Sequence, residues 1–165
     1  MIFVTIGTHE QSFNRLVEYM DKWAEKHDEK VIIQTGYSTC EPEHCEWKMS
    51  YPYQMILKMV SEARIVITHG GLSSFIIPLQ SNKIPIVVPR KKKFHEHIND
   101  HQTEFSRQFA QRQGNIIVVE NIDDLGSIIE NYEDIVRNMK NNMVSNNERF
   151  CKNLESIVNE LKKKK

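Results

Sequence analysis

Short apolar segments alternate with segments of helical pattern along the first 119 residues, and this alternation limits the fold more than any other feature. In the segments between the apolar runs, apolar residues such as Phe13, Leu16 and Met20 recur every three or four positions, which is the period of an amphipathic helix. The apolar runs, which we expect to be strands, are residues 1–6, 31–34, 65–68, 86–88 and 116–119. Apolar strands separated by helices form parallel sheets covered on both faces. We therefore expect an α/β, Rossmann-like fold.

The length of 165 residues suits one domain with a single hydrophobic core. Residues 37–51 lack a clear period and are expected to form a loop that leaves room for a short strand. Two short helices are expected between residues 120 and 147. Residues 145–165 are expected to form an amphipathic helix with a lysine tail, because Phe150, Leu154, Ile157 and Leu161 follow helical spacing.

Charge and cysteine content exclude several classes of protein. The chain has 22 basic and 22 acidic residues, so its net charge gives no reason to expect bulk binding to nucleic acid. An odd number of cysteines without zinc-site spacing (Cys40, Cys45 and Cys151) favours a reducing compartment, and we expect the cytoplasm. No run approaches the ~18 apolar residues of a membrane span, and the amino terminus has no leader pattern, so membrane contact is expected to be peripheral.

Three polar loops follow the expected strands, at residues 7–11, 69–74 and 90–101. In open parallel sheets, ligands bind beyond the carboxyl ends of the strands. The fold is therefore expected to gather these three loops around one crevice.

The loop at residues 69–74 has the chemistry of an anion site. The first amides of a helix lack internal partners and point outward, with the positive end of the helix dipole behind them. Gly70 and Gly71 allow close approach of a ligand, and Ser73 or Ser74 is expected to cap the helix and donate to phosphate. His69 belongs to the same expected site. The alternative is an ordinary glycine turn between a strand and a helix.

The loop after the first strand offers a second set of donors. Gly7 and Thr8 are expected to face phosphate or a transferred group, and His9 to carry a proton, because imidazole titrates near neutral pH. The alternative is a tight turn with a solvated histidine.

The sequence also resembles a known family. The resemblance rests on four motifs within residues 1–119, which are FVTIGTHEQSF, THGGLSSFIIPL, IPIVVPR and HEHINDHQTEF. They closely resemble the small glycosyltransferase subunits of bacterial capsule and exopolysaccharide pathways. These subunits, of the glycosyltransferase family 28 C-terminal domain type, are relatives of the catalytic subunit of the eukaryotic dolichol-linked UDP-GlcNAc transferase. The resemblance implies a single nucleotide-sugar-binding domain over residues 1–165, corresponding to the C-terminal half of a GT-B glycosyltransferase.

The function implied by the resemblance is transfer of a hexose, with galactose or glucose favoured, from a UDP-sugar to a lipid-linked saccharide. It implies an inverting enzyme with an expected β-1,4 linkage, held at the inner face of the plasma membrane by a membrane-anchored, acceptor-binding partner subunit. The alternative from another class is a non-catalytic nucleotide-sugar-binding or regulatory subunit. A nicotinamide dehydrogenase is disfavoured, because no G-x-G-x-x-G follows any expected strand.

The third loop is rich in donors. Arg90 is expected to pair with phosphate through its planar fork, and Glu96 to orient a histidine or contact the sugar. Asn99 and Gln102 carry amides suited to sugar hydroxyls, and in relatives the matching glutamine region faces the donor sugar. The lysines at positions 91–93 are either a solvated loop or a membrane-facing patch.

His95, His97 and His101 have the spacing H-x-H-x3-H, which would suit a metal. The family pattern explains these histidines better, as part of the donor-binding loop, and the chain has no D-x-D motif. No metal or other cofactor is therefore expected. One departure from the family concerns residues 75–78, which are apolar where relatives place an acidic residue on the ribose; Gln80 or the backbone would have to replace it.

Overall fold

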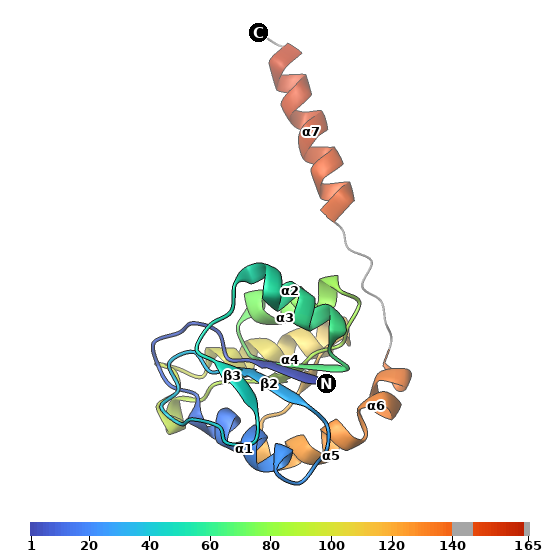
Figure 1. The fold of residues 1–165 in the computed structure, drawn as a ribbon. Helices are drawn as coiled ribbons and strands as arrows, with labels where there is room; N and C mark the ends of the chain where they lie inside the picture. Colours follow the sequence, from blue (N-terminus) through green and yellow to red (C-terminus); the bar gives the residue numbers. More distant parts are fainter. Residues whose placement is uncertain (140–146, 164–165) are drawn as a thin grey trace.

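A computed structural model describes residues 1–139 and 147–163 of the chain. Its centre is a parallel six-stranded sheet in the order β3-β2-β1-β4-β5-β6 (Figure 1). The strands are β1 (Ile2–Thr5), β2 (Val31–Gln34), β3 (Glu46–Lys48), β4 (Ile65–His69), β5 (Ile86–Val88) and β6 (Ile117–Val118). The expected α/β, Rossmann-like parallel sheet is confirmed.

Helices cover both faces of this sheet. They are α1 (Asn14–Ala24), α2 (Tyr53–Glu62), α3 (Leu72–Gln80), α4 (His101–Gln113), α5 (Leu125–Glu130) and α6 (Tyr132–Asn138), with short 3-10 turns at Lys92–Phe94 and Ile122–Asp124. A further helix, α7 (Asn147–Lys163), is not one of those that cover the sheet. Alternate residues of β1 divide between the faces: Ile2 and Val4 pack with α1, α5 and α6, whereas Phe3 packs with α2. Helices α3 and α4 pack together on the second face through Phe75 and Phe105. The two short helices expected after residue 120 are present as α5 and α6.

The strand order places a topological switch point at the carboxyl edge of the sheet, and the ends of the strands there define the crevice in which a ligand is expected. Strands β1 and β4 are neighbours in register, with Thr5 opposite Thr68. After β1 the chain enters α1 on one face, and after β4 it enters α3 on the other face. The two loops therefore part at this switch point, which is where ligands bind in open α/β sheets.

Strand β3 occupies part of the segment expected to be a loop. Glu46, Trp47 and Lys48 are all exposed at the edge of the sheet and pair with β2 alone. An edge strand without a buried face shows no apolar alternation, so its sequence carried little strand signal.

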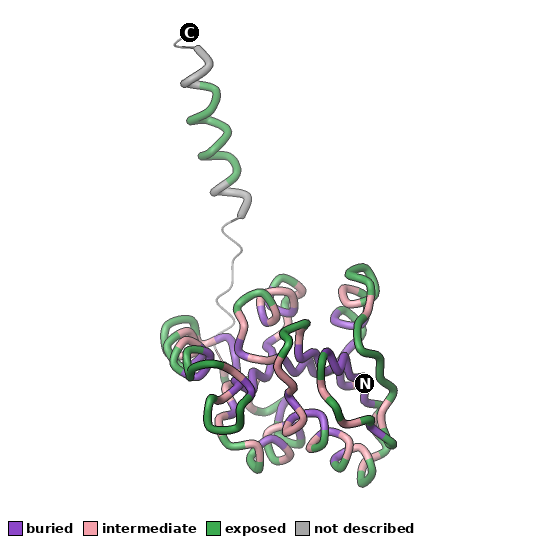
Figure 2. The backbone as a smooth tube through the Cα atoms, turned by 90° about the vertical axis from the view of Figure 1, so that its left-hand side faces the viewer, coloured by how far each residue is buried: buried purple, intermediate pink, exposed green. Residues whose placement is uncertain are grey.

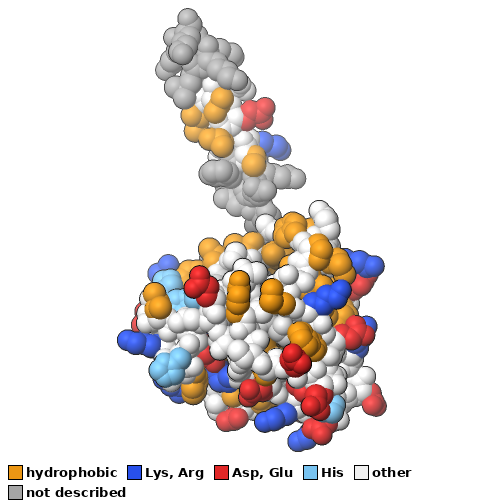
Figure 3. All heavy atoms as spheres, turned by 60° about the vertical axis from the view of Figure 1, so that its left-hand side comes forward, with side chains coloured by type: hydrophobic (Ala, Val, Ile, Leu, Met, Phe, Trp, Pro, Cys, Tyr) orange, Lys and Arg blue, Asp and Glu red, His pale blue; other side chains and the backbone are white. Residues whose placement is uncertain are grey.

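The amphipathic C-terminal helix predicted over residues 145–165 is present from 147 to 163, and the remaining positions lie outside the described residues. Its side chains Leu154, Ile157 and Val158 are 40–55% exposed. Figure 3 shows hydrophobic side chains at the surface of the described part of α7. In Figure 2 the described turns of α7 are exposed, whereas the sheet is buried. The core clusters found within the described ranges contain no residue of α7. No helix in these ranges combines the length and apolar character needed to cross a bilayer.

Candidate functional site

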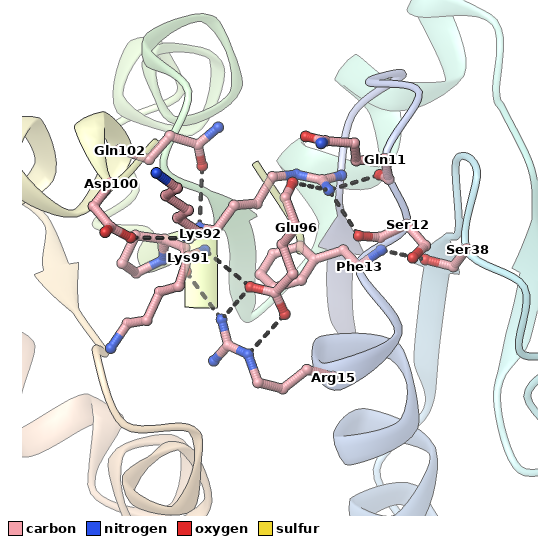
Figure 4. Close-up of polar contacts among 12 residues, drawn as sticks. Gln11, Ser12, Phe13, Arg15, Ser38, Lys91, Lys92, Glu96, Asp100 and Gln102 are labelled. Atoms are coloured by element: carbon pink, nitrogen blue, oxygen red, sulfur yellow. Dashed lines mark hydrogen bonds and ion pairs between the residues drawn. The ribbon is translucent and has the colours of Figure 1, made fainter. Parts of the chain in front are cut away.

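Arg90 ties the loop after β1 to the loop after β5. Its side chain is fully buried, and its Nη2 donates to the carbonyl of Ile6 at 3.0 Å. Its Nη1 donates to the carbonyls of Gln11 at 2.7 Å, Ser12 at 3.1 Å and Glu96 at 3.2 Å (Figure 4). One guanidinium thus holds two of the three site loops.

The expectation that the fork of Arg90 pairs with phosphate is not what the structure shows. Carbonyl oxygens accept from both terminal nitrogens of the fork, because the loop after β1 brings them within hydrogen-bond distance of the buried guanidinium. Burial lowers the pKa of Arg90 to about 10, so the side chain stays charged at neutral pH.

Glu96 makes a second tie between the loops and α1. Its carboxylate, 4% exposed, pairs with Arg15, whose Nε and Nη2 donate to Oε1 at 2.8 Å and Oε2 at 2.9 Å. The same carboxylate accepts the amide of Lys91 at 3.0 Å, and Arg15 also donates to the carbonyl of Pro89. Glu96 therefore holds an arginine and a turn, where a histidine or a sugar was expected. Sequence reasoning missed Arg15, because nothing in the pattern of α1 separates it from the other charged residues of that helix.

The start of α3 differs from the serine-capped helix that was expected. The helix begins at Leu72, with Gly71 as its N-cap residue, and neither serine caps it. The imidazole of His69 instead holds the turn before the helix: Nδ1 accepts the amide of Gly71 at 3.0 Å, and Nε2 lies 2.5 Å from Oγ of Ser74. Ser73 is left exposed at the crevice.

His69 is a neutral side chain in this site. Burial, and then the positive charge of Arg90, lower its pKa to about 4. Because Nδ1 accepts a hydrogen bond from Gly71, the proton lies on Nε2 and points to Ser74. His69 therefore shapes the turn and adds no charge to it.

Two amides at the start of α3 remain available to a ligand. Gly70 donates to Oε1 of Gln102 at 3.1 Å, and Gly71 donates to His69. In the described part of the chain, no acceptor takes the amides of Leu72 and Ser73. These amides and the hydroxyl of Ser73 lie at the positive end of the helix dipole, so an anion fits there.

The loop after β1 packs directly on this turn. Gly7 has a φ of +74°, which favours glycine, and a Cβ at this position would lie 2.6 Å from Nε2 of His69. Thr8 follows and is exposed. The expected convergence of the loops after β1, β4 and β5 is therefore present.

His9 and His97 meet across the crevice, with ring centroids 5.2 Å apart. Burial lowers the pKa of His9, and the charges of Arg90 and His97 lower it further. Nδ1 of His9 accepts the amide of Gln11 at 3.2 Å, so neutral His9 carries its proton on Nε2. In this arrangement Nε2 of His9 is a hydrogen-bond donor. Nε2 could accept a proton only if the ring proton moved to Nδ1, which would then no longer accept the amide of Gln11.

The three histidines of the H-x-H-x3-H spacing do not converge on a common point. His95 is exposed at the end of a 3-10 turn, with a φ of +58°. His97 interacts with Asn99, and His101 stacks on Phe105 at 5.9 Å between ring centroids. Among residues 1–139 and 147–163, no group of three His, Cys, Asp or Glu side chains could hold a metal ion. The expectation that no cofactor is needed stays a prediction.

Comparison with known proteins gives a family and a set of similar folds. The sequence pattern of the family described as "Glycosyltransferase family 28 C-terminal domain" matches residues 1–164. No curated protein matches the chain in sequence.

The solved structures that are similar to this chain include three glycosyltransferases. The calicheamicin glycosyltransferase CalG4 is 14% identical with a TM-score of 0.64, and the match covers 97% of this chain and 43% of that one. The glycotransferase of kitacinnamycin is 17% identical with a TM-score of 0.57, covering 78% and 34%. The spinosyn forosaminyltransferase SpnP is 16% identical with a TM-score of 0.54, covering 80% and 34%. The expected fold, the C-terminal half of a GT-B glycosyltransferase, is confirmed, and the chain spans less than half of each of these proteins.

Proposed function

Since this chain belongs to the glycosyltransferase family 28 C-terminal domain family, we propose that it binds a UDP-sugar and transfers the hexose to an acceptor. Galactose or glucose is the favoured hexose. The acceptor is a lipid-linked saccharide of capsule or exopolysaccharide synthesis, and the new linkage is β-1,4. The observation that carries the proposal is the family pattern over residues 1–164, on a chain whose α3 start presents free amides at the sheet crevice.

The start of α3 is the proposed seat of the diphosphate. The amides of Leu72 and Ser73 and the hydroxyl of Ser73 donate to its oxygens, and the helix dipole adds to this field. The acceptor hydroxyl attacks the anomeric carbon while the bond to the β-phosphate oxygen breaks, and the electron pair leaves with UDP. Fixed donors aimed at the departing phosphate stabilise the charge that develops in the transition state.

His9 is proposed to act on the sugar side of this reaction. Its Nε2–H would donate to an oxygen of the sugar or of the β-phosphate, because Nδ1 is engaged by Gln11. The base that takes the proton from the acceptor hydroxyl then comes from the partner subunit. Asn99 and His97 complete the third side of the donor site.

An acceptor-binding half, carried by a separate subunit, is part of the proposal, because the chain resembles the small subunits of two-subunit glycosyltransferases. The chain itself spans 34–43% of the glycosyltransferases whose fold it shares. We propose that this half is membrane-anchored and holds the chain at the inner face of the plasma membrane.

The proposal is tested by titrating the purified chain with UDP, UDP-galactose and UDP-glucose in a calorimeter, and then by assaying transfer from radiolabelled donors with the co-expressed membrane subunit. We expect binding by the chain alone and transfer only with both subunits. A folded chain that binds none of the three nucleotides would contradict the proposal. Donor binding together with transfer that survives replacement of this chain's His9 and Ser73 would favour the non-catalytic alternative.

UDP is expected to bind with the same affinity in EDTA as in magnesium, to within about twofold. The proposed site uses amides and a helix dipole, whereas metal-dependent sites use carboxylates to hold a cation. Calorimetry in the two buffers measures the difference. Binding that disappears in EDTA would restore a metal-dependent site.

A chain that ends at Met139 is expected to keep the UDP affinity and, to within about 2 °C, the unfolding temperature of the full chain. The reason is that the core clusters found in the described ranges include no residue of α7. The same truncation should abolish co-purification with the membrane subunit, because α7 carries the exposed apolar side chains proposed to dock on it.

A second variant, the full chain with Leu154→Ser and Ile157→Ser, keeps the helix but removes two of its exposed apolar side chains. This variant, like the truncated chain, should no longer co-purify with the membrane subunit. Partner binding that survives both changes would place the docking surface elsewhere on the domain.

A further inference from the structure

The side chain of Gln102 joins the ends of two neighbouring strands. Gln102 lies in the first turn of α4 and is 8% exposed. Its Oε1 accepts the amide of Gly70 at 3.1 Å and the amide of Arg90 at 3.2 Å. A carbonyl oxygen has two lone pairs, so these two donors use its full accepting capacity.

This contact lies where the β4–β5 pairing stops. The last paired residues are His69 and Val88, and beyond them the two loops part. The amides of Gly70 and Arg90 are buried and need an acceptor there, and the amide oxygen of Gln102 supplies it. The side chain of Gln102 thus takes the place of the main-chain carbonyl that would accept these amides if the pairing of β4 and β5 continued.

Helix α4 also presses on the turn itself. A Cβ at Gly70 would lie 2.9 Å from Cβ of Gln102 and 2.9 Å from Oγ of Ser106. The turn therefore lies directly on the first two turns of α4, and glycine is needed for this approach. The hydrogen bond and the close packing together fix the direction in which the chain enters α3.

We propose that Gln102 is a positioning residue for the diphosphate. It holds the Gly70 peptide next to Arg90, at the start of the loop after β5, and thereby orients the free amides of Leu72 and Ser73 toward the ligand. The inference rests on the proposed function, since it takes the UDP moiety as the ligand of those amides. It differs from direct reading of the sugar, because Oε1 is occupied and only the Nε2 group of Gln102 remains for a hydroxyl.

The test compares Gln102→Leu with Gln102→Glu, and uses Gln108→Leu, an exposed position on the same helix, as the matched control. Leucine removes the acceptor, whereas glutamate keeps carbonyl-type oxygens at the same reach but loses the NH₂ group. We expect Gln102→Leu to weaken the binding of UDP and of UDP-sugar equally, by about tenfold or more. Both affinities are measured at a temperature well below the unfolding temperature of the variant. Gln102→Glu should recover at least about threefold of that loss, and the control should bind as the unmodified chain does.

Three results would overturn the inference. One is that Gln102→Leu weakens only the UDP-sugar, which would assign Gln102 to the sugar. Another is that this variant lowers thermal stability and leaves UDP affinity unchanged, which would make the contact merely structural. The third is that Gln102→Glu binds no better than Gln102→Leu.

An NMR measurement keeps the inference testable even if the chain binds no UDP, in which case the proposed function fails on its own. The amides of Gly70 and Arg90 should exchange slowly with solvent in the unmodified chain and at least about tenfold faster in Gln102→Leu. The amide signals of Leu72 and Ser73 should shift in the same variant. Fast exchange at Gly70 in the unmodified chain, or unmoved Leu72 and Ser73 signals in the variant, would refute the positioning role.

Discussion

Replacing Arg90 by leucine is expected to lower the free energy of unfolding by about 4 kcal/mol, the largest effect on stability that we predict. In the described part of the chain, Arg90 is the one donor to the buried carbonyls of Ile6 and Glu96. It is likewise the one donor there to the carbonyls of Gln11 and Ser12, and leucine leaves all four facing an apolar side chain. A buried carbonyl without a partner costs about 1–3 kcal/mol. In a domain of this size the loss corresponds to a fall of roughly 10 °C in the unfolding temperature.

Thermal and urea unfolding monitored by circular dichroism measure this effect. The matched control is Arg107→Leu, because Arg107 is exposed and pairs with Glu120 at the surface. Surface pairs contribute little, so the control should unfold almost as the unmodified chain does. Arg90→Lys should fall between the two, because an ammonium cannot serve carbonyls on both loops at once. Equal stability of Arg90→Leu and the control would show that the loops do not depend on the guanidinium.

Replacing Ser73 by aspartate is expected to weaken UDP binding by at least about tenfold, or 1.4 kcal/mol. The carboxylate would stand beside the free amides of Leu72 and Ser73, where the diphosphate is proposed to lie, and would both occupy the donors and repel the ligand. An acidic residue in the first turn favours a helix, so the variant should be folded and at least as stable as the original.

Ser73→Asn is the matched control, because asparagine has nearly the same shape as aspartate without its charge. Its UDP affinity should stay within about threefold of that of the unmodified chain, because asparagine does not repel the negatively charged diphosphate as aspartate does. Gly71→Asp would be a poorer test, because a Cβ at Gly71 would lie 2.4 Å from the ring of His69. Equal affinities for the aspartate and asparagine variants in calorimetry would place the diphosphate away from the start of α3.

The sheet and the convergence of the loops could be predicted from the sequence because apolar periodicity follows burial. The runs at residues 31–34 and 86–88 coincide with β2 and β5, and Phe13 and Trp23 are core residues as their helical spacing indicates. β3 could be predicted only as a short strand for which the loop at residues 37–51 leaves room, because its three residues bury no face.

The pairing of polar groups within the site could not be read from the sequence. A guanidinium can donate to carbonyl oxygens as well as to phosphate, so the role of Arg90 depended on where the loop after β1 lies. The same holds for the turn before α3, where the nearby imidazole of His69 binds the amide of Gly71 and the hydroxyl of Ser74, and neither serine caps the helix. Regular spacing was misleading for His97, whose partner His9 is 88 positions away in the chain and comes from another strand end.

The internal tethers of the crevice have a consequence for the order of events during turnover. Arg90 and the Arg15–Glu96 pair connect the loop after β5 to the first loop and to α1 without help from a ligand. A nucleotide that enters such a crevice has little loop motion to freeze, so little of its binding free energy is spent on ordering the protein. Under the proposed function, the chain is therefore suited to bind its sugar donor before it meets the proposed membrane subunit.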